Sequence, residues 1–347
     1  MSDVGTEFLG SNSEAVDEIP QIKIVTVGVG GGGSNTVNRL LNMGVKGTEL
    51  VAVNTDVQHF RIIDDRIKKV LIGKGITRGL GAGGDPMIGR KAAEADRKLI
   101  SDVLKGSHLV FLCAGMGGGT GTGAAPVIAQ VAKEEGAIVM AMVTYPFDLE
   151  RQRKVNAEAG INELRKYCDS VIILDNNRVV KAFANSPMNT AFEMADSILA
   201  KAIIGLVWTI TQESLIRIDF ADVKAVMSRG EVGFISVGTG KGAGKVEAAV
   251  EGVMKNKLLD VDFEDAKGGL LHITGSRDLT LGDAIRAGSL ISERMSPSAT
   301  IKFGARIMPG MEDQLEIVAI ITGVKGGSIV GKISEKSESH NASLDFI

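Results

Sequence analysis

A run of glycines and threonines at residues 114–126, with the sequence AGMGGGTGTGAAP, carries residue types that bind phosphate. Glycine has no Cβ, so its backbone adopts positive φ and brings successive N–H groups toward an anion. Thr120 and Thr122 add hydroxyl donors, and the helix that follows presents its positive end to the same point. A tight turn needs one or two glycines, whereas residues 115–123 contain six. The run therefore predicts a phosphate-binding loop between a buried strand at 108–113 and a helix.

Two further glycine-rich loops follow predicted strands. The first, GVGGGGSN at 28–35, contains G-x-G-x-x-G, and the second occupies 73–86. Asp56 follows another strand, at 50–53, where a dinucleotide-binding fold would hold a ribose. Because parallel strands gather ligands at their carboxyl ends, three such loops indicate a chain of phosphates held from several sides. An NAD-dependent oxidoreductase stays an alternative, although it needs only one of the three loops.

None of these loops has the P-loop spelling G-x-x-x-x-G-K-[ST]. The nearest spelling, at 326–332, is followed by Ile333 and is preceded by no βαβ unit, so we attribute it to chance.

Two charged residues follow the predicted strand at 137–143. Glu150 and Arg153 lie just beyond its carboxyl end, where a carboxylate accepts ribose hydroxyls and a guanidinium reaches ribose or phosphate. The alternative is an ordinary charged helix start.

A long helix is predicted from Thr190 to about Gln212, and it is apolar on most sides. Such a helix must be buried between two bodies of protein. Phe192 and Asp196 lie one turn apart on it, offering a surface for base stacking and a carboxylate for the N1–H and 2-amino group of guanine. The same spacing is also typical of packing and a solvated face.

Asp219 and Asp222 follow this helix. About 23 helical residues span roughly 34 Å, so these carboxylates lie too far from the phosphate loops to serve them within one chain. They either form an ordinary helix start or complete the site of a neighbouring molecule.

Composition excludes several classes of protein. A net charge of -3 gives no electrostatic basis for binding nucleic acid, and no run approaches the ~18 to 20 apolar residues of a membrane span. Two isolated cysteines argue against structural zinc and a disulfide framework and favour the cytoplasm. We predict no metal site built by the protein itself.

The chain resembles the FtsZ family of prokaryotic cell-division proteins, relatives of tubulin. The likeness covers about residues 20–325 and rests on motifs that include GVGGGGSN at 28–35, NTD at 54–56, GLGAGGDP at 79–86, GMGGGTGTGAAP at 115–126, PFDLE at 146–150, AFEMAD at 191–196 and DFADVKAVM at 219–227. It implies a Rossmann-like parallel-sheet GTPase domain joined by a long central helix to a smaller α+β domain. The expected divisions are a disordered arm at 1–19, the GTP-binding domain at 20–189, the central helix at 190–213, the C-terminal domain at 214–330 and a disordered tail at 331–347.

The resemblance also implies site residues. GTP or GDP, with Mg²⁺, would be bound by Gly31, Gly32, Gly33, Ser34, Asn35, Asp56, Ala82, Gly83, Gly84, Gly117, Gly118, Gly119, Thr120, Gly121, Thr122, Glu150, Arg153, Asn176, Phe192 and Asp196. Asp219 and Asp222 would act in trans, polarising the water that attacks the γ-phosphate of the next subunit in a head-to-tail homopolymer.

Three features depart from the family pattern. Arg217 stands where the family usually has asparagine, which favours a slowly hydrolysing scaffold as a second hypothesis. Arg153 is one residue closer to Glu150 than the family's arginine. The ending at Ser343–Ile347 is more similar to archaeal members; we expect it to bind a membrane-anchoring adaptor at the division site, with no direct membrane insertion.

Overall fold

The computed structural model describes residues 22–182, 185–211, 215–216, 218–227, 232–255, 263–264 and 266–324. The predicted arm at 1–19 and the tail at 331–347, with Ser343–Ile347, lie outside them. Within them a ten-stranded sheet has the order β3-β2-β1-β4-β5-β6-β7-β10-β8-β9. The strands are β1 (Ile24–Val29), β2 (Glu49–Asn54), β3 (Lys68–Leu71), β4 (Leu109–Gly115), β5 (Ile138–Tyr145), β6 (Ser170–Asp175), β7 (Val232–Lys241), β8 (Gly268–Gly275), β9 (Thr300–Ile307) and β10 (Gln314–Thr322).

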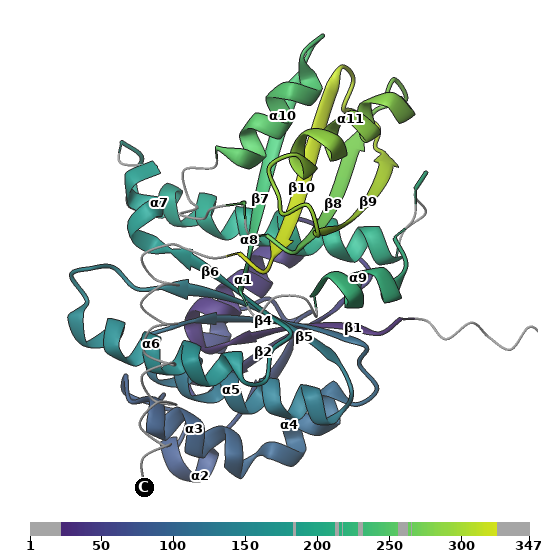
Figure 1. Cartoon of the computed structure of the whole chain (residues 1–347). Helices are drawn as coiled ribbons and strands as arrows, with labels where there is room; N and C mark the ends of the chain where they lie inside the picture. The colour runs from purple at the N-terminus through teal and green to yellow at the C-terminus, as the bar shows by residue number, and fades with distance from the viewer. Residues whose placement is uncertain are drawn as a thin grey trace, which may run out of the picture.

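Helices cover the sheet on both faces (Figure 1). They are α1 (Gly30–Asn42), α2 (Lys74–Thr77), α3 (Pro86–Ala95), α4 (Arg97–Leu104), α5 (Gly119–Glu134), α6 (Arg151–Arg165), α7 (Asn176–Ala182), α8 (Met188–Thr211), α9 (Phe220–Met227), α10 (Lys245–Met254) and α11 (Leu281–Ser292), with a short 3-10 helix η1 (His59–Arg61). None of the helices described is both long enough and apolar enough to cross a membrane.

The first six strands form a parallel half-sheet whose side chains alternate between two cores. In β4, Phe111 and Cys113 face the core that contains α1 and α8, whereas Val110 and Leu112 face the core that contains α4, α5 and α6. This alternation is the period of two expected of a strand buried on both faces. The mostly parallel sheet with helices on both faces is the Rossmann-like half that the sequence predicts.

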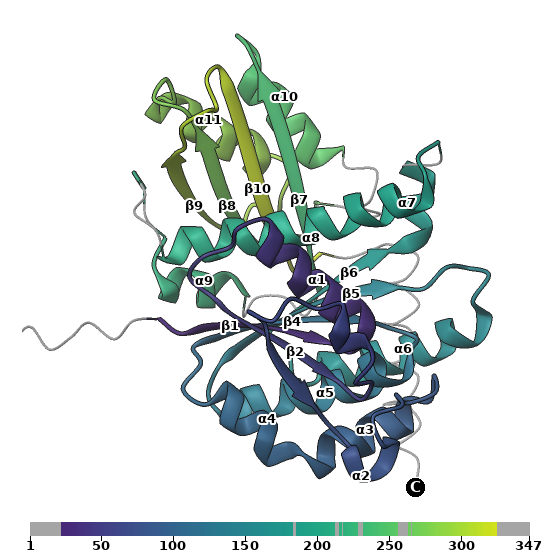
Figure 2. The same cartoon turned by 180° about the vertical axis from the view of Figure 1, so that it is seen from behind.

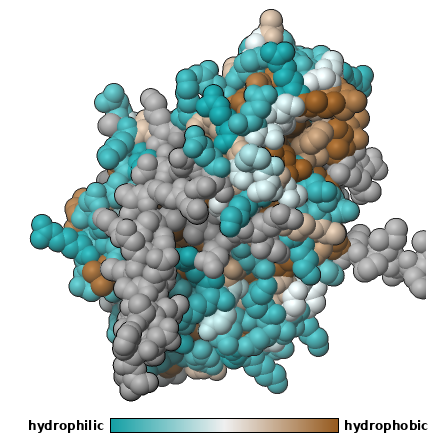
Figure 3. Space-filling view, viewed as in Figure 1, coloured by the Kyte–Doolittle hydropathy of each residue, from teal (hydrophilic) through white to brown (hydrophobic). Residues whose placement is uncertain are grey.

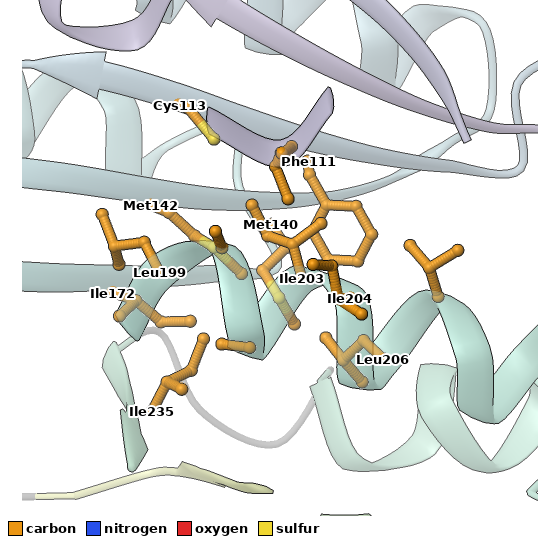
Figure 4. Packing of buried hydrophobic residues seen from close by; sticks show 14 of the residues in the cluster. Phe111, Cys113, Met140, Met142, Ile172, Leu199, Ile203, Ile204, Leu206 and Ile235 are labelled. Atoms are coloured by element: carbon orange, nitrogen blue, oxygen red, sulfur yellow. The ribbon is translucent and has the colours of Figure 1, made fainter. Parts of the chain in front are cut away.

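Helix α8 lies between the two halves of the molecule. Its buried residues contact the large side chains of the parallel half-sheet, with Phe111, Met140 and Met142 facing Leu199 and Ile203 (Figure 4). The same core includes Ile235 of β7 and Val318 of β10 from the second half. A helix buried on two sides must be apolar on most of its surface, as the sequence of α8 is. Because α8 extends between the two ends of the molecule, its length sets the distance between them.

The second half is a four-stranded sheet covered by α10 and α11 on its outer face. Antiparallel pairing joins β7 to β10 and β10 to β8, whereas β8 and β9 run parallel. The two halves form one sheet because β7 pairs with β6 at Val171↔Val232 and Ile172↔Gly233.

Three elements differ from their sequence predictions. The helix expected at 87–104 is divided into α3 and α4 at Asp96, whose carboxylate accepts a hydrogen bond from the N–H of Gly73 at 2.6 Å. Helices α1 and α5 begin inside their glycine runs, at Gly30 and Gly119. The glycines after these points therefore form helical turns instead of extended loops.

Candidate functional site

A cavity of about 450 Å³ lies beyond the carboxyl ends of β1, β2, β4 and β5. It is lined by all three glycine loops and by the segments that follow β2 and β5. The lining residues are Val29, Gly30, Gly31, Gly32, Asn54, Asp56, His59, Leu80, Gly81, Ala82, Gly83, Gly84, Gly115, Met116, Gly118, Gly119, Thr120, Gly121, Thr144, Pro146, Glu150, Arg153 and Asn176. This position is where open α/β sheets bind ligands.

Two helix N-termini meet at the cavity. Helices α1 and α5 begin at Gly30 and Gly119, and within the described chain neither has a side-chain cap or an acidic residue in its first turn. Their first N–H groups have no partner within their own helix and carry the positive end of the helix dipole. An anion in the cavity would satisfy these donors.

Some glycines of the site leave space that a ligand can fill. A Cβ built on Gly83, Gly84 or Gly118 would meet no atom within 4 Å, and all three residues line the cavity. Gly83 and Gly84 also have positive φ, at 59° and 82°. The backbone at these points is exposed to the cavity, as a phosphate cradle requires.

Other glycines allow the loops themselves to pack. A Cβ on Gly33 would lie 2.1 Å from the carbonyl oxygen of Cys113, and one on Gly121 would lie 2.4 Å from that of Gly115. These contacts leave no room for a side chain, so the two glycines bring α1 against β4 and seat the start of α5. The abundance of glycine in the three loops thus has two separate causes.

Hydrogen bonds connect the loops. The hydroxyl groups of Thr55 and Thr120 are 2.7 Å apart and buried, which connects the segment after β2 to the start of α5. The N–H of Gly81 donates to the carbonyl of Thr55 at 3.1 Å, and the N–H of Val57 donates to that of Gly79 at 3.0 Å. Residues 54–57 and 79–84 are therefore joined by hydrogen bonds into one wall of the cavity.

Glu150, Arg153 and Asn176 line another part of the cavity. Arg153 donates a hydrogen bond to the Glu150 carboxylate, which also accepts the N–H of Phe147 at 3.1 Å. Asn176 begins α7, next to Asp175. This group supplies both donors and acceptors to the cavity, and Arg153 packs directly against Gly117 of the glycine loop.

Five residues of the glycine loops that were predicted to contact the ligand do not line the cavity. Gly33 and Ser34 are buried in α1, and Asn35 is exposed on it. Thr122 accepts a hydrogen bond from the N–H of Gly117 at 2.7 Å, so these two shape the loop. The early start of α1 turns residues 33–35 away from the cavity.

The pair predicted to bind guanine lies in α8. Asp196 is partly buried beside α1 and does not line the cavity. Burial raises the pKa of its carboxyl to about 6; Arg39 acts in the opposite direction, and Glu193 raises the pKa further. Phe192 lies in the helical part of α8, and its side chain lies outside the described structure.

Helix α9, which Asp219 directly precedes and whose first turn contains Asp222, lies at the other end of α8 from α7 (Figures 1 and 2). Asp219 accepts the N–H of Asp222 at 2.7 Å, the hydrogen bond of a helix cap. Asp222 pairs with Lys302 of β9 at 2.6 Å. At 1.5 Å per residue, the 24 residues of α8 extend roughly 36 Å. Within one chain these carboxylates cannot reach the cavity, and Arg217 lies outside the described residues.

His59 is a lining residue that the sequence did not identify. Its imidazole packs on Gly31, where an added Cβ would lie 3.5 Å from Cε1, and its Nε2 is buried without a hydrogen-bond partner among the described residues. The sequence signal that could have identified His59 is its position just after Asn54-Thr55-Asp56, the segment that follows β2 and lines the cavity.

Comparison with protein families gives two matches. The model of the Tubulin/FtsZ family GTPase domain matches residues 23–184, and that of the FtsZ family C-terminal domain matches residues 231–325. Cell division protein FtsZ 2 of Methanocaldococcus jannaschii is 52% identical over 319 residues, which cover 91% of this chain and 84% of that relative. Cell division protein FtsZ 2 of Haloferax volcanii is 47% identical over 326 residues, covering 94% and 81%.

Solved structures agree with these matches. An empty FtsZ dimer of M. jannaschii superposes with a TM-score of 0.82 at 42% identity, covering 87% of this chain and 88% of that one. A protofilament of CetZ2 from H. volcanii with bound GTPγS has a TM-score of 0.76 at 22% identity, which shows a shared fold alone.

Proposed function

The chain belongs to the FtsZ family of tubulin-related cell-division GTPases, and from this premise we propose how its two ends build one GTPase site. GTP binds in the cavity at the carboxyl ends of the parallel strands. Subunits assemble head to tail, and Asp219 and Asp222 of one subunit reach the γ-phosphate held by the next. The observation that carries this proposal is the separation of the cavity and the two carboxylates by the length of α8.

The phosphates take the part of the cavity where glycine leaves open space. N–H groups at the starts of α1 and α5 and along 82–84 donate to phosphate oxygens, with Thr120 as a hydroxyl donor. Glu150 and Arg153 hold the ribose side. Asn176, Phe192 and Asp196 bind guanine, which requires Asp196 to approach the cavity edge when the nucleotide is bound.

Mg²⁺ is part of this proposal. Among the described residues no group of three or more His, Cys, Asp or Glu side chains is placed to hold a metal ion. Asp56 lines the cavity and supplies a carboxylate from the wall formed by residues 54–57 and 79–84. Mg²⁺ is commonly held by phosphates, water and one or two carboxylates, so the residues present fit an ion that arrives with the nucleotide. Bound there, it would neutralise charge on the phosphates.

Exposed apolar side chains at both ends support head-to-tail assembly. Leu80 and Leu149 are exposed beside the cavity, and Leu215, Leu281 and Ile285 are exposed at the other end. Figure 3 shows apolar side chains gathered in the region of α11 and β9. Different surfaces at the two ends make a heterologous contact that does not close, and such a contact generates filaments.

Hydrolysis follows from the completed site. A water held by Asp219 and Asp222 attacks the γ-phosphorus, a carboxylate accepts its proton, and the bond to the bridging oxygen breaks to give GDP and phosphate. We further propose that the polymer acts in the cytoplasm at the division site, where Ser343–Ile347 binds a membrane-anchoring adaptor.

The substitution Asp222→Asn tests this proposal because it removes the charge and keeps the shape. We expect unchanged GTP affinity and hydrolysis slower by about 100-fold, the contribution of a positioned general base. Glu316→Gln is the matched control, since Glu316 is a similarly exposed carboxylate that pairs with Lys201 in the middle of the molecule. Loss of GTP binding in Asp222→Asn, or hydrolysis equal to that of the control, would reject the assignment.

A further inference from the structure

Lys302 pairs with Asp222, one of the two carboxylates at the end of the molecule opposite the nucleotide cavity. Its Nζ is 2.6 Å from Oδ1 of Asp222, and the side chains are 40% and 27% exposed. The hydrogen bond and charge of Asp222 raise the pKa of the lysine, and Asp219 adds to this effect. The ammonium group therefore interacts with both residues.

The backbone fixes this arrangement. Asp222 is in the first turn of α9, which Asp219 caps, and α9 packs on β8 and β9. Lys302 is on β9, the edge strand of the sheet, opposite Leu270 of β8. The lysine and the acids thus come from separate elements that the C-terminal half brings together.

A cation at this position reduces the repulsion between the two carboxylates and the phosphates of a neighbouring subunit. Two carboxylates that approach a nucleoside triphosphate on a neighbouring subunit face like charge, and like charges that meet at an interface oppose its formation. A flexible lysine side chain that pairs with one carboxylate offsets part of that repulsion. The pair also restricts the rotation of the Asp222 side chain.

We propose that Lys302 is a positioning residue of the GTPase site that forms between subunits. It holds the Asp222 carboxylate in one orientation and offsets its charge while that end docks on the phosphates of the next subunit. This inference rests on the proposed function, in which Asp222 acts in trans.

Lys302→Met removes the charge and keeps most of the length of the side chain. The expected result is hydrolysis slower by about ten-fold per assembled subunit, the scale of one charge-assisted hydrogen bond, with unchanged nucleotide affinity in the isolated subunit. Lys302→Arg should retain activity within about three-fold because it keeps the charge. Lys201→Met is the matched control: Lys201 pairs with Glu316 at 3.1 Å with side-chain exposures of 43% and 25%, and its loss should leave hydrolysis unchanged.

A double-mutant cycle separates positioning from general damage. If Lys302 acts through Asp222, Lys302→Met should have no further effect on hydrolysis in the Asp222→Asn background. Sedimentation of each sample gives the assembled fraction, and circular dichroism verifies folding; Lys302→Gln replaces the methionine variant if that one is unfolded.

The outcomes distinguish the two proposals. If Asp222→Asn hydrolyses GTP like the unaltered protein, the proposed function itself fails. If Asp222→Asn is slow but Lys302→Met and Lys302→Gln are as fast as Lys201→Met, only the role of Lys302 is overturned. A ten-fold loss that persists in the Asp222→Asn background, or one that Lys302→Arg fails to restore, overturns it as well.

Discussion

The elevated pKa of Asp196 predicts that nucleotide affinity depends on pH. Guanine offers two donors, N1–H and the 2-amino group, and both require an ionised carboxylate. Because burial raises the pKa to about 6 in the free protein, about nine-tenths of the carboxyl is ionised at pH 7 and about one-tenth at pH 5. Guanine binding favours the ionised form, so affinity is present above this pKa and is lost as pH falls through it. We expect a loss of about ten-fold between pH 7 and pH 5, equivalent to about 1.4 kcal/mol.

Equilibrium titration with GDP from pH 5 to pH 8 measures this effect without hydrolysis. A terminal phosphate also titrates near pH 6, so the informative quantity is the affinity of the unaltered protein divided by that of Asp196→Asn at each pH. This ratio should fall about ten-fold from pH 7 to pH 5.

Two neighbours supply a test of direction. Arg39 lowers the pKa of Asp196 and Glu193 raises it, and the two side chains face each other at 3.8 Å. Arg39→Gln should therefore move the midpoint to higher pH, and Glu193→Gln should move it to lower pH. A ratio that stays flat, or an Asp196→Asn protein that binds GDP as tightly as the unaltered chain at pH 7, would refute the role of Asp196.

Three further predictions concern the loops and the core. Gly33→Ala should lower the free energy of unfolding by about 3 kcal/mol in denaturant titrations, because its Cβ would lie 2.1 Å from a carbonyl oxygen, whereas Gly75→Ala, in open space, should not. Gly118→Val should weaken GDP binding about 100-fold with normal folding, since its side chain enters the cavity without strain at φ -84°. Burial, and to a smaller extent Arg306, lowers the pKa of His272 to about 4. Because the unfolded chain binds a proton at this histidine that the folded chain does not, the free energy of unfolding should fall by about 2 kcal/mol from pH 7 to pH 5. This pH dependence should be absent in His272→Gln.

Much of the site follows from sequence because its residues are local in the chain. The glycine runs directly follow strands, and parallel strands end at one edge, so Gly31, Gly83 and Gly118 meet at one cavity. The nicotinamide-dependent alternative is excluded by the family match, which leaves the GTPase as the function of these loops.

What the sequence could not give depends on contacts between distant segments. The tight approach of Gly33 to Cys113 and the pairing of Asp222 with Lys302 join residues that are 80 positions apart in each case. The orientation of Ser34 depends on α1 beginning at Gly30, and no local signal distinguishes that start from one four residues later. Glycine counts predict a loop, but only packing shows which glycines face a ligand.

Mixing two impaired variants tests the shared site most directly. Gly118→Val has a cavity of low nucleotide affinity and intact carboxylates, whereas Asp222→Asn has an intact cavity and a damaged acid, so each variant alone is slow at a GTP concentration that saturates only the intact cavity. If the carboxylates act in trans, phosphate release from GTP should recover in the mixture, because an Asp222→Asn cavity can face the acids of a Gly118→Val subunit. The amount of tagged Gly118→Val that sediments with Asp222→Asn measures how many mixed contacts the polymer contains. Recovery in proportion to this co-assembly is the predicted result; co-assembled polymer that releases no more phosphate than the separate variants would contradict the account.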